Sequence, residues 1–363
     1  PGSWRPRHET GTMRVALATD AWYPQTNGVV RTLTETKRCL EDLGHAVLVV
    51  SPADFRSLPM PPYPEIRLAL RPGPGVRRRL DAFSPHAIHI ATEGPVGLAA
   101  RRYCLRRRLD FTTSYHTQFP RYVRMRVPIP ERVTYRYLRW FHTPAARTMV
   151  PTPAIKALIE GHGFTHVVLW GRGVDTDLFH PGRRRGLEGE KPILMYMGRV
   201  AVEKNIRAFL DLDLPGTRYV VGDGPALEDL KKEYPHVIFT GARHGEELAA
   251  TVAGADVFIF PSLTDTFGLV LLEAMACGVP VAAFPVNGPV DVVAPGTGCL
   301  DEDLGMAIQG ALRLDRADCR AYAETRSWAA ASAQFAGHLT PVNEAAAPLP
   351  TAASDLAILT ESR

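Results

Sequence analysis

A long hydrophobic run is absent from the sequence. No stretch approaches the roughly 18 consecutive apolar residues that a membrane-spanning helix needs, and no signal peptide precedes Met13. The 363 residues are 45% hydrophobic and 22% charged, which is typical of a globular protein and excludes general disorder. The length is sufficient for two domains that each bury a core. We therefore expect a two-domain protein in the cytoplasm.

Cysteine is scarce, and no two cysteines form a CxxC pair. An odd, scattered set excludes a disulfide framework and a zinc site of the usual ligand spacing. Reduced thiols in the cytosol fit this pattern better. The five residues are Cys39, Cys104, Cys277, Cys299 and Cys319.

Two nucleotide-binding signatures are also missing. No GxGxxG follows the first expected strand, RVALATD at 14–20, which argues against a NAD-dependent dehydrogenase. The segment VVGDGP (220–225) lacks the GxxxxGK[ST] arrangement of a P-loop, and GDG alone is a weak signal. We expect a tight turn there, near the base or ribose of a bound nucleotide.

The chain does contain two successive series of strands and helices. In the first series a strand at 14–20 precedes YPQTNG, a helical pattern over Val29–Leu43 that Gly44 closes, and a strand in HAVLVVSP. The second series begins at PILMYMGR and continues through TRYVVGDGP, HVIFTG, DVFIFPS and VPVAAF. These patterns predict two doubly wound α/β domains that face each other, with ligands in the cleft between them.

The domain boundaries follow from this alternation. We place the N-terminal domain at 13–180 and the C-terminal domain at 181–340, with tails at 1–12 and 341–363. The proline-rich residues 52–75 are interpreted as a long surface loop. Cys319–Leu339 is interpreted as a terminal helix, which is placed to cross back to the first domain. The alanine- and proline-rich tail is expected to be disordered.

Two loops of the second domain have the residues of a diphosphate site. In MGRVAVEKN, Arg199 and Lys204 follow a strand, and fixed cations stabilise a leaving nucleotide diphosphate without proton transfer. In PSLTDTFGLVLLEAMACGVP, residues 264–266 are candidate N-caps, and Gly268 lets a phosphate approach the free amides of a helix start. The alternative, ordinary surface charges near helix ends, stays open.

Two carboxylates accompany this second loop. Asp265 and Glu273 are eight residues apart, which is about 12 Å along one helix, near the span from the sugar to the ribose of a nucleotide sugar. One carboxylate would then bind the hydroxyls of each. The alternative is that Asp265 merely caps the helix and that Glu273 is an ordinary helix residue.

The first domain contributes two candidates. Gly28 in TNGVV comes just before the expected helix, where backbone amides would meet the same diphosphate from across the cleft. His116 in SYHTQFP comes directly after an apolar strand. A structural, hydrogen-bonded histidine is the alternative to a catalytic one.

Basic charge is concentrated in one segment. Residues Arg101–Arg147 include twelve arginines, no lysine and only Asp110 and Glu131 as acids, so this segment is +10 and the remainder is −6. Such a block indicates an anionic partner, with a solvated helical face as the alternative. Interleaved aromatic residues favour a surface that contacts lipid head groups.

Seven segments together resemble glycosyltransferase family 4. The family has the GT-B fold, in which two Rossmann-like domains face each other, and the similarity extends over about residues 13–339. The segments, in chain order, are YPQTNGVVRTL, SYHTQFPRY, VPTPAIKALIEGHGF, GRGVDTDLFHP, GRVAVEKN, VVGDGP and DTFGLVLLEAMACGVPV.

The resemblance implies roles for the candidates. The family transfers a sugar from a nucleotide donor with retention of anomeric configuration, by same-face attack in which the leaving phosphate helps to deprotonate the acceptor, and generally without a metal or other cofactor. Arg199 and Lys204 would bind the distal phosphate, Glu273 the ribose hydroxyls, and His116 would lie beside the sugar on the acceptor side. The amides of Gly268, Leu269 and Val270 would contact the diphosphate or sugar, with Gly28 opposite.

One position departs from the family pattern. The carboxylate pair is usually two glutamates, whereas Asp265 is one methylene shorter. This leaves its contact with the sugar, and so the sugar's identity, open.

Within the family, HIATEGP and SYHTQFP are similar to the branch of sulfoquinovosyl-diacylglycerol synthases, diacylglycerol glycosyltransferases and α-mannosyltransferases. We therefore predict transfer from UDP-glucose or UDP-glucuronate to a lipid such as diacylglycerol, by a peripheral enzyme on the inner face of the cytoplasmic membrane. Glu93 and Tyr115 are expected on the acceptor side, with a loop-turn role for Glu93 as the alternative. The segment Arg101–Arg147 would contact the anionic leaflet.

Three other functions compete with this one. A GDP-mannose-dependent α-mannosyltransferase would act on a glycan or polyprenyl-linked acceptor. A sugar-nucleotide epimerase of the same fold would convert the donor without an acceptor. An arginine-rich nucleic-acid-binding protein comes last, because no nucleic-acid motif is present and we expect no nucleic-acid partner.

Overall fold

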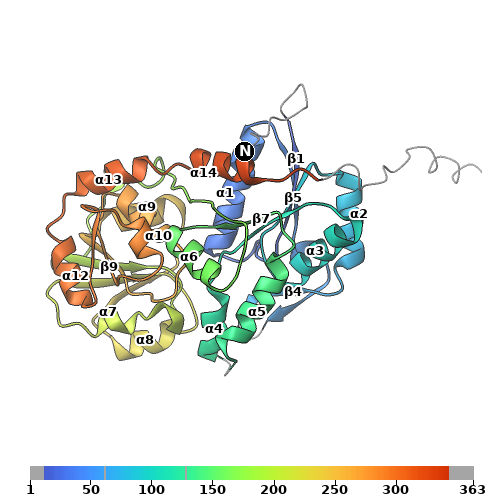
Figure 1. The fold of residues 1–363 in the computed structure, drawn as a ribbon. Coiled ribbons are helices and arrows are strands. Elements are labelled where there is room, and N and C mark those ends of the chain that lie inside the picture. The colour runs from blue at the N-terminus through green and yellow to red at the C-terminus, as the bar shows by residue number, and fades with distance from the viewer. Residues whose placement is uncertain (1–11, 61–62, 127–128, 343–363) are drawn as a thin grey trace, which may run out of the picture.

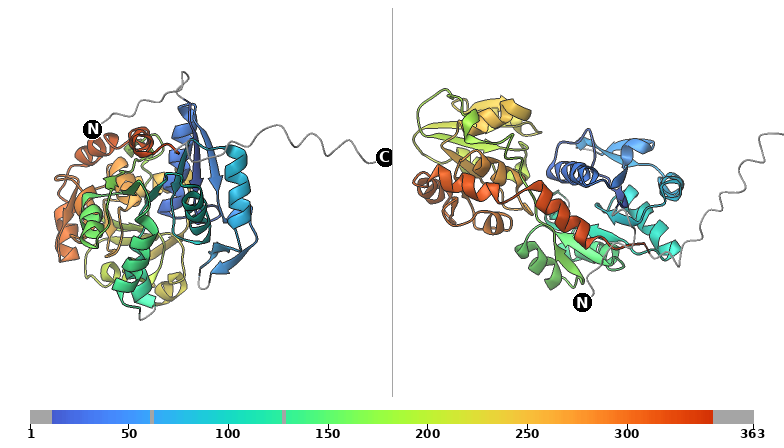
Figure 2. Two further views of the ribbon diagram at one scale, coloured as in Figure 1. Left: turned by 45° about the vertical axis from the view of Figure 1, so that its right-hand side comes forward. Right: turned by 90° about the horizontal axis from the view of Figure 1, so that it is seen from above.

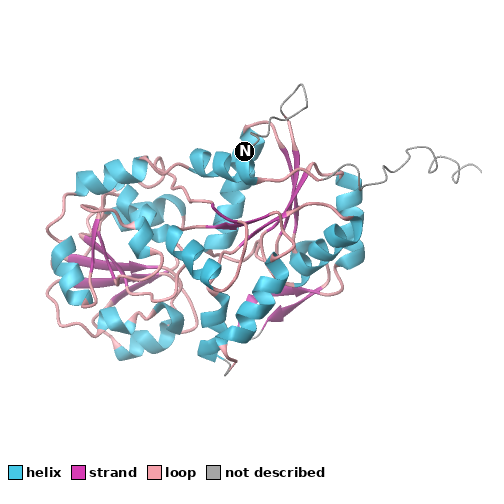
Figure 3. Cartoon of the chain, in the orientation of Figure 1, coloured by secondary structure: helices cyan, strands magenta, loops and turns pink. Residues whose placement is uncertain are grey.

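The computed structural model describes residues 12–60, 63–126 and 129–342. Two lobes lie side by side, and each has strands enclosed by helices (Figure 1, Figure 3). Each lobe contains one six-stranded sheet in which all pairs are parallel. This confirms the predicted doubly wound α/β class.

The sheet of the first lobe has the strand order β2-β1-β5-β6-β7-β8. Its strands are short and mostly apolar on both faces, because helices cover both sides of a parallel sheet. The strands are β1 (Arg14–Ala18), β2 (Ala46–Val50), β5 (Ala87–Ile90), β6 (Thr112–Ser114), β7 (Arg147–Val150) and β8 (Val167–Leu169).

Helix α1 begins at Gly28 because Asn27 caps it, accepting hydrogen bonds from the amides of Val29 and Val30. Gly44, with φ of 83°, follows the end of the helix as predicted. Helix α1 packs on one face of the sheet, whereas α2, α3 and α5 pack on the other. The helices of this lobe are α1 (Gly28–Asp42), η1 (Pro52–Asp54), α2 (Gly73–Phe83), α3 (Pro95–Arg107), α4 (Phe119–Arg126), α5 (Glu131–His142) and α6 (Pro153–Gly161).

The interpretation of residues 52–75 as a loop was wrong. The segment forms η1 and an antiparallel hairpin of β3 (Ser57–Met60) and β4 (Tyr63–Ala69). Pro59 is tolerated because this two-stranded hairpin stands apart from the main sheet, where a missing N–H costs little. The local prolines concealed the apolar alternation of β4.

The second lobe has the strand order β11-β10-β9-β12-β13-β14, in which successive strands are added on one side of β9 and then, from β12, on the other side. This reversal is the switch point at which doubly wound sheets bind ligands. Strand β14 was not among the predicted strands. The strands are β9 (Ile193–Met197), β10 (Thr217–Val221), β11 (Ile238–Gly241), β12 (Val257–Phe260), β13 (Val281–Ala283) and β14 (Gly298–Leu300).

Helices cover both faces of this second sheet. None of the helices in the described part of the chain has the length and apolar character that crossing a bilayer requires. The helices here are η2 (Pro181–Arg183), η3 (Val202–Lys204), α7 (Arg207–Leu210), α8 (Leu227–Glu233), α9 (Gly245–Ala253), α10 (Leu269–Ala276), α11 (Pro289–Val292) and α12 (Leu304–Ala311).

The predicted terminal helix over 319–339 is two helices, α13 (Arg316–Glu324) and α14 (Trp328–His338). The break arises because Ser327 caps a new helix by accepting from the amide of Ala330. Helix α14 crosses back to the first lobe (Figure 2), and there the Phe335 ring packs on the Trp170 ring. The predicted tails fall mostly on 1–11 and 343–363, outside the described residues. Val342 still donates to the His86 carbonyl.

Candidate active site between the lobes

Two helix starts meet where the lobes contact each other. Gly28 opens α1, and a Cβ added there would lie 3.6 Å from the side chain of Leu269, which opens α10. Leu269 also packs against Cys39 and Trp328, at the contact of α1 with α14. Each helix start carries partial positive charge from its amides. The structure thus brings the predicted donor-binding positions 28 and 269 together from opposite lobes.

The predicted N-caps at 264–266 were wrong. The N-cap of α10 is Gly268, with φ of 84°, and no side chain caps the first turn. A glycine is required there because side chains rarely adopt this left-handed conformation. Within the described residues, the amides of Gly268, Leu269 and Val270 donate to no protein acceptor. These donors are therefore available to an anion.

Lys204 and Asp265 form an ion pair at the carboxyl ends of β9 and β12. The Lys204 ammonium lies 2.6 and 2.8 Å from the two carboxylate oxygens of Asp265. The side chains are only 19% and 17% exposed, so little water screens the pair. Asp265 therefore neutralises the charge of Lys204, which was predicted from the sequence to bind phosphate.

Arg199 forms an ion pair with a residue of the other lobe. Its Nη2 lies 3.0 Å from Oε1 of Glu65, which comes from β4 of the hairpin. The β3–β4 hairpin, which was not predicted from the sequence, therefore places Glu65 beside Arg199, a predicted phosphate ligand. No local pattern around Glu65 indicated this contact, since 134 residues separate the partners.

Glu273 lies on α10 and is buried, with 5% of its surface exposed. Burial raises the pKa of its carboxyl, while the Arg31 guanidinium 3.0 Å away acts in the opposite direction. Arg31 comes from α1 and also lies over the Phe179 ring. Glu273 is thus held in an apolar setting beside a cation of the other lobe.

The glycines of VVGDGP allow two strand ends to approach closely. A Cβ at Gly222 would lie 1.9 Å from the carbonyl oxygen of Gly198, so any other residue at this position would clash with the backbone. Asp223 accepts from the amide of Val200 in the same turn. The predicted tight turn is present, and it braces the loop that leads to Arg199.

His116 follows β6 and has both ring nitrogens engaged. Its Nε2 lies 2.8 Å from Ser114 Oγ, and its Nδ1 lies 3.1 Å from Nη2 of Arg172. Burial, followed by the nearby Arg172 charge, lowers the pKa of the ring well below its usual value. His116 is therefore neutral at physiological pH.

The loop after β6 also joins the loop after β12. Thr266 donates to the His116 carbonyl over 2.6 Å, and Gln118 donates to the Asp265 carbonyl over 3.0 Å. Gln118 is fully buried. Further along the contact, Asp291 accepts from the amide of Ala154. No pattern along the chain indicates these partners, since the contacts exist only once the lobes are placed.

The two predicted acceptor-side residues have different surroundings. Glu93 follows β5 and lies 3.1 Å from Nε2 of His142, while its carbonyl accepts from the Tyr137 hydroxyl. Tyr115 is fully buried in the apolar cluster that also contains Tyr135. The structure thus gives Tyr115 a packing position, while Glu93 lies at a strand end.

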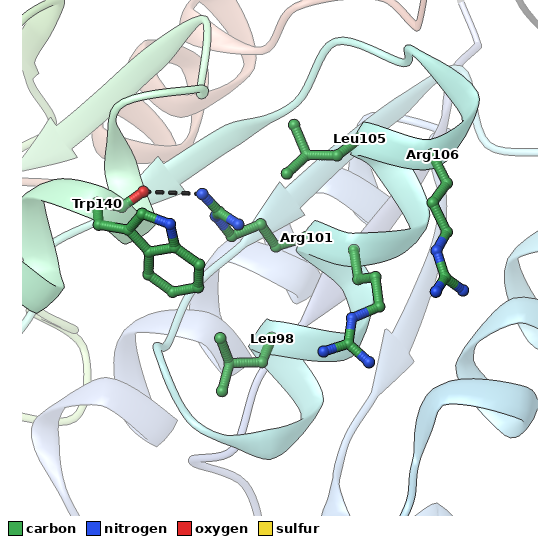
Figure 4. Close-up of a pocket in the computed structure, with 6 residues that line it drawn as sticks. Leu98, Arg101, Leu105, Arg106 and Trp140 are labelled. Atoms are coloured by element: carbon green, nitrogen blue, oxygen red, sulfur yellow. Dashed lines mark hydrogen bonds between the residues drawn. The ribbon is translucent and has the colours of Figure 1, made fainter.

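The basic segment Arg101–Arg147 does not form one surface. Arg101 is 8% exposed, donates to the carbonyls of Trp140 and Phe141, and stacks 4.0 Å over the Trp140 ring, so it joins α3 to α5 (Figure 4). Arg102 and Arg106 instead line a pocket with the exposed side chains of Leu105 and Trp140.

An adjacent groove of about 1010 Å³ lies between α2 and α3. We call it the arginine groove. Asp81 is its one acid, and it pairs with Arg107 and Arg77. Its arginines are Arg71, Arg77, Arg78, Arg102, Arg106 and Arg107. Three of these come from outside the segment that the sequence singled out.

No group of three or more metal-ligating side chains occurs in the described ranges 12–60, 63–126 and 129–342.

Comparison with known sequences is consistent over both lobes. Residues 26–178 match the family described as Glycosyltransferase Family 4, and residues 191–314 match Glycosyl transferases group 1. A GDP-mannose-dependent alpha-mannosyltransferase of Mycobacterium tuberculosis is 30% identical over 78% of this chain and 82% of its own length. The sulfoquinovosyl transferase of Arabidopsis thaliana is 32% identical over 70% of this chain, which spans 56% of that protein. An alpha-monoglucosyldiacylglycerol synthase of Streptococcus pneumoniae is 28% identical over 75% of this chain and 71% of its length.

Solved structures share the fold. Sucrose-phosphate synthase from Thermosynechococcus elongatus has a TM-score of 0.72 at 21% identity, covering 89% of this chain and 97% of its own. HepE from Anabaena in complex with UDP-glucose has a TM-score of 0.66 at 15% identity, covering 89% and 98%. The two parallel sheets, the helix starts that meet between them and these relatives agree: the chain belongs to glycosyltransferase family 4 and has the GT-B fold.

Proposed function

We propose that this glycosyltransferase transfers a hexose from a nucleotide sugar to a membrane lipid, with retention of configuration. The observation that supports this most is the meeting of Gly28 on α1 with Leu269 on α10 from opposite lobes. Uncapped amides and the partial charge of α10 lie at this meeting point. Lys204 and Asp265 lie at the ends of the adjacent strands β9 and β12.

We assign a role in donor binding to Arg199, Lys204 and Glu273. Arg199 and Lys204 bind the distal phosphate and stabilise the charge that develops on it as the donor bond breaks. To do so, each exchanges a carboxylate, Glu65 or Asp265, for phosphate oxygens. Glu273 accepts hydrogen bonds from the ribose hydroxyls, and the Arg31 guanidinium opposes the effect of burial on its carboxyl.

The reaction needs no protein nucleophile. The bond between the anomeric carbon and the phosphate oxygen breaks, the acceptor oxygen bonds to that carbon on the same face, and the acceptor proton passes to the departing phosphate. The amides of Gly268, Leu269 and Val270 stabilise the phosphate charge in this step. His116, neutral and doubly hydrogen-bonded, lines the acceptor side.

The arginine groove supports a lipid acceptor on an anionic surface. Arg71, Arg78, Arg102 and Arg106 pair with no acidic side chain in the described part of the chain. Trp140, which lines the neighbouring pocket with Arg102 and Arg106, is 51% exposed. Uncompensated arginines next to an exposed aromatic ring suit lipid head groups. The enzyme would then act peripherally, at the inner face of the cytoplasmic membrane.

The relatives favour GDP-mannose as the first donor to test. Three GDP-mannose-dependent mannosyltransferases are 30% identical to the chain over 78% of its length. UDP-glucose is the second donor, supported by the alpha-monoglucosyldiacylglycerol synthase. Asp265, shorter than the usual glutamate, is the position at which the sugar of this donor is selected.

The deciding experiment measures nucleotide release from GDP-mannose, UDP-glucose and UDP-glucuronate, with vesicles of anionic phospholipid that contain or lack diacylglycerol. Release of one nucleotide only with diacylglycerol, together with a new glycolipid, supports the proposal and identifies the donor. Release that is indifferent to lipid, or donor conversion without any acceptor, contradicts the lipid acceptor. No release from any donor contradicts the donor assignment.

Membrane binding has its own test. The double variant Arg78→Gln with Arg102→Gln removes two charges from the arginine groove and should weaken binding to anionic vesicles about 30-fold at low salt, at about 1 kcal/mol per arginine. The matched control, Arg185→Gln with Arg313→Gln, removes two exposed charges from the other lobe. Equal loss in both variants would show that net charge alone drives binding.

A further inference from the structure

Arg172 is a buried cation that the sequence analysis gave no role. It lies in the loop after β8, with 6% of its surface exposed. Its Nη1 donates to the carbonyls of Trp170 and Gly171 over 2.6 and 2.9 Å, and its guanidinium stacks 4.3 Å over the Trp170 ring. No acidic side chain in the described ranges forms an ion pair with Arg172. Carbonyls, a ring and His116 hold it in place.

The contact between Arg172 and His116 has a fixed polarity. A guanidinium has only donors, so Nη2 of Arg172 donates and Nδ1 of His116 accepts over 3.1 Å. A neutral imidazole has one N–H, which must then be on Nε2. That nitrogen lies 2.8 Å from Ser114 Oγ, which is able to accept. The contacts thus select one tautomer of His116.

Other titratable groups near His116 reinforce this selection. His89 on β5 lies 3.1 Å from the same Ser114 Oγ, and His142 on α5 is the remaining neighbour. Thr266, from the second lobe, donates to the backbone carbonyl of His116. A proton added to His116 would face Arg172 directly, and none of the carboxylates in the described part of the chain contacts the ring. Both the geometry and the charges oppose the imidazolium.

We propose that Arg172 is a positioning residue that fixes His116 as the neutral Nε2–H tautomer in a single orientation. His116 then lines the sugar-transfer site as a polar group of fixed orientation and neither accepts nor releases a proton during the reaction. This consequence rests on the proposed function, whereas the tautomer itself does not.

The test is a long-range proton–nitrogen correlation spectrum of the full chain labelled with ¹⁵N-histidine. The spectrum of a His116→Gln variant identifies the signals of His116 among the twelve histidines. We expect an Nε2–H pattern that does not change between pH 8 and pH 5.5. A signal with the proton on Nδ1, or a titration within this range, would overturn the inference.

Variants of Arg172 test the cause. Arg172→Met removes the donor and should allow His116 to exchange tautomers or to titrate, whereas Arg172→Lys keeps a cationic donor and should preserve the wild-type pattern. Arg313→Met, the same replacement at an exposed position, is the control. A wild-type pattern in Arg172→Met would overturn the inference. If that variant fails to fold, the wild-type titration still decides.

Kinetics separate the tautomer of His116 from the proposed function. The pH profile of kcat should be flat between pH 5.5 and 8 in the wild type and should acquire an acid limb in Arg172→Met. A fixed tautomer without turnover of any donor would contradict the proposed function and leave the tautomer inference standing. An acid limb already present in the wild type, with a His116 titration to match, would overturn the inference.

Discussion

The two lobes have similar sheets but different interiors. In the first lobe, Thr112, Thr113 and Ser114 of β6 are buried and bond to His89 and His142. In the second lobe, the central strands β9 and β12 consist of apolar residues and one tyrosine. Lys204 and Asp265 instead follow the ends of these strands. The sheet of the first lobe thus contains a buried polar network, whereas the central strands of the second lobe are apolar and have polar side chains beyond their ends.

This difference has a physical reason. A diphosphate is bound by surface amides and cations at helix and strand ends, and an apolar core supports those ends without any internal polar group. His116, in contrast, must be held in one tautomer and one orientation. Buried hydroxyls and imidazoles do this only if every member is hydrogen-bonded. The part of this network that contains Ser114 and His89 therefore contributes to the positioning of His116.

The largest expected effect concerns Lys204, which lies beyond the carboxyl ends of the central strands of the second lobe. Lys204→Ala should lower donor turnover about a thousandfold, because it removes a cation from the leaving diphosphate. The matched control is Lys191→Ala, since Lys191 pairs with Asp256 at the opposite ends of the same strands, β9 and β12. Steady-state kinetics compare the two. Similar activity in both variants would show that a lysine at the carboxyl ends of these strands contributes no more to donor turnover than one at the opposite ends.

A pair of reciprocal changes tests the interiors directly. Thr113→Val removes a hydroxyl that lies 2.9 Å from His142 Nδ1 and 3.1 Å from Thr148 Oγ1. Val220→Thr adds a hydroxyl to the apolar core of the second lobe. Each should lower the free energy of unfolding by about 1–3 kcal/mol, because each leaves a buried polar group without a partner. Urea denaturation measures both. A neutral Thr113→Val would mean that the network is dispensable for stability.

The buried polar network of the first lobe should make the stability of the fold depend on pH, through His89. Burial, with the Arg172 and His142 charges, lowers the pKa of His89 to about 3. Below pH 6.5 the unfolded chain therefore takes up a proton that the folded state refuses, and stability falls as pH falls. Between pH 7 and pH 5 His89 alone should account for a loss of about 2 kcal/mol.

The measurement compares urea unfolding of the wild type and of His89→Gln at both pH values. The raised pKa values of Asp20 and Glu273 act in the opposite direction in both proteins, so the difference between them isolates His89. Equal pH dependence in the two proteins would mean that His89 is solvated in the fold.

The elements of both lobes were largely readable from sequence, because strand and helix periodicities are local. Helix α1 begins one residue from its predicted start. The errors arose where a local rule was overridden. Prolines concealed the β3–β4 hairpin, Ser327 opened a new helix within a continuous helical pattern, and Gly268 replaced the expected side-chain cap.

The site was only partly readable. Arg199, Lys204 and Asp265 lie in recognisable motifs after strand ends, and Glu273 lies in the helix that follows one of these motifs. Their partners Glu65, Arg31 and Gln118 come from the other lobe, so no spacing along the chain could reveal them. Arg172 lies within a segment that resembled the family, GRGVD, yet its role depends on the orientation of His116.

The smallest expected effect concerns the exposed faces of the lobes, where the contrast should vanish. Glu41 pairs with Lys37 on α1, and Glu324 pairs with Arg320 on α13, each at the i,i+4 spacing of a helix surface. Glu41→Ala and Glu324→Ala should each change the free energy of unfolding by no more than about 0.5 kcal/mol, because solvent screens both pairs. Urea denaturation at low and high salt measures this. A larger loss in one lobe alone would mean that its surface, and not only its interior, is organised differently.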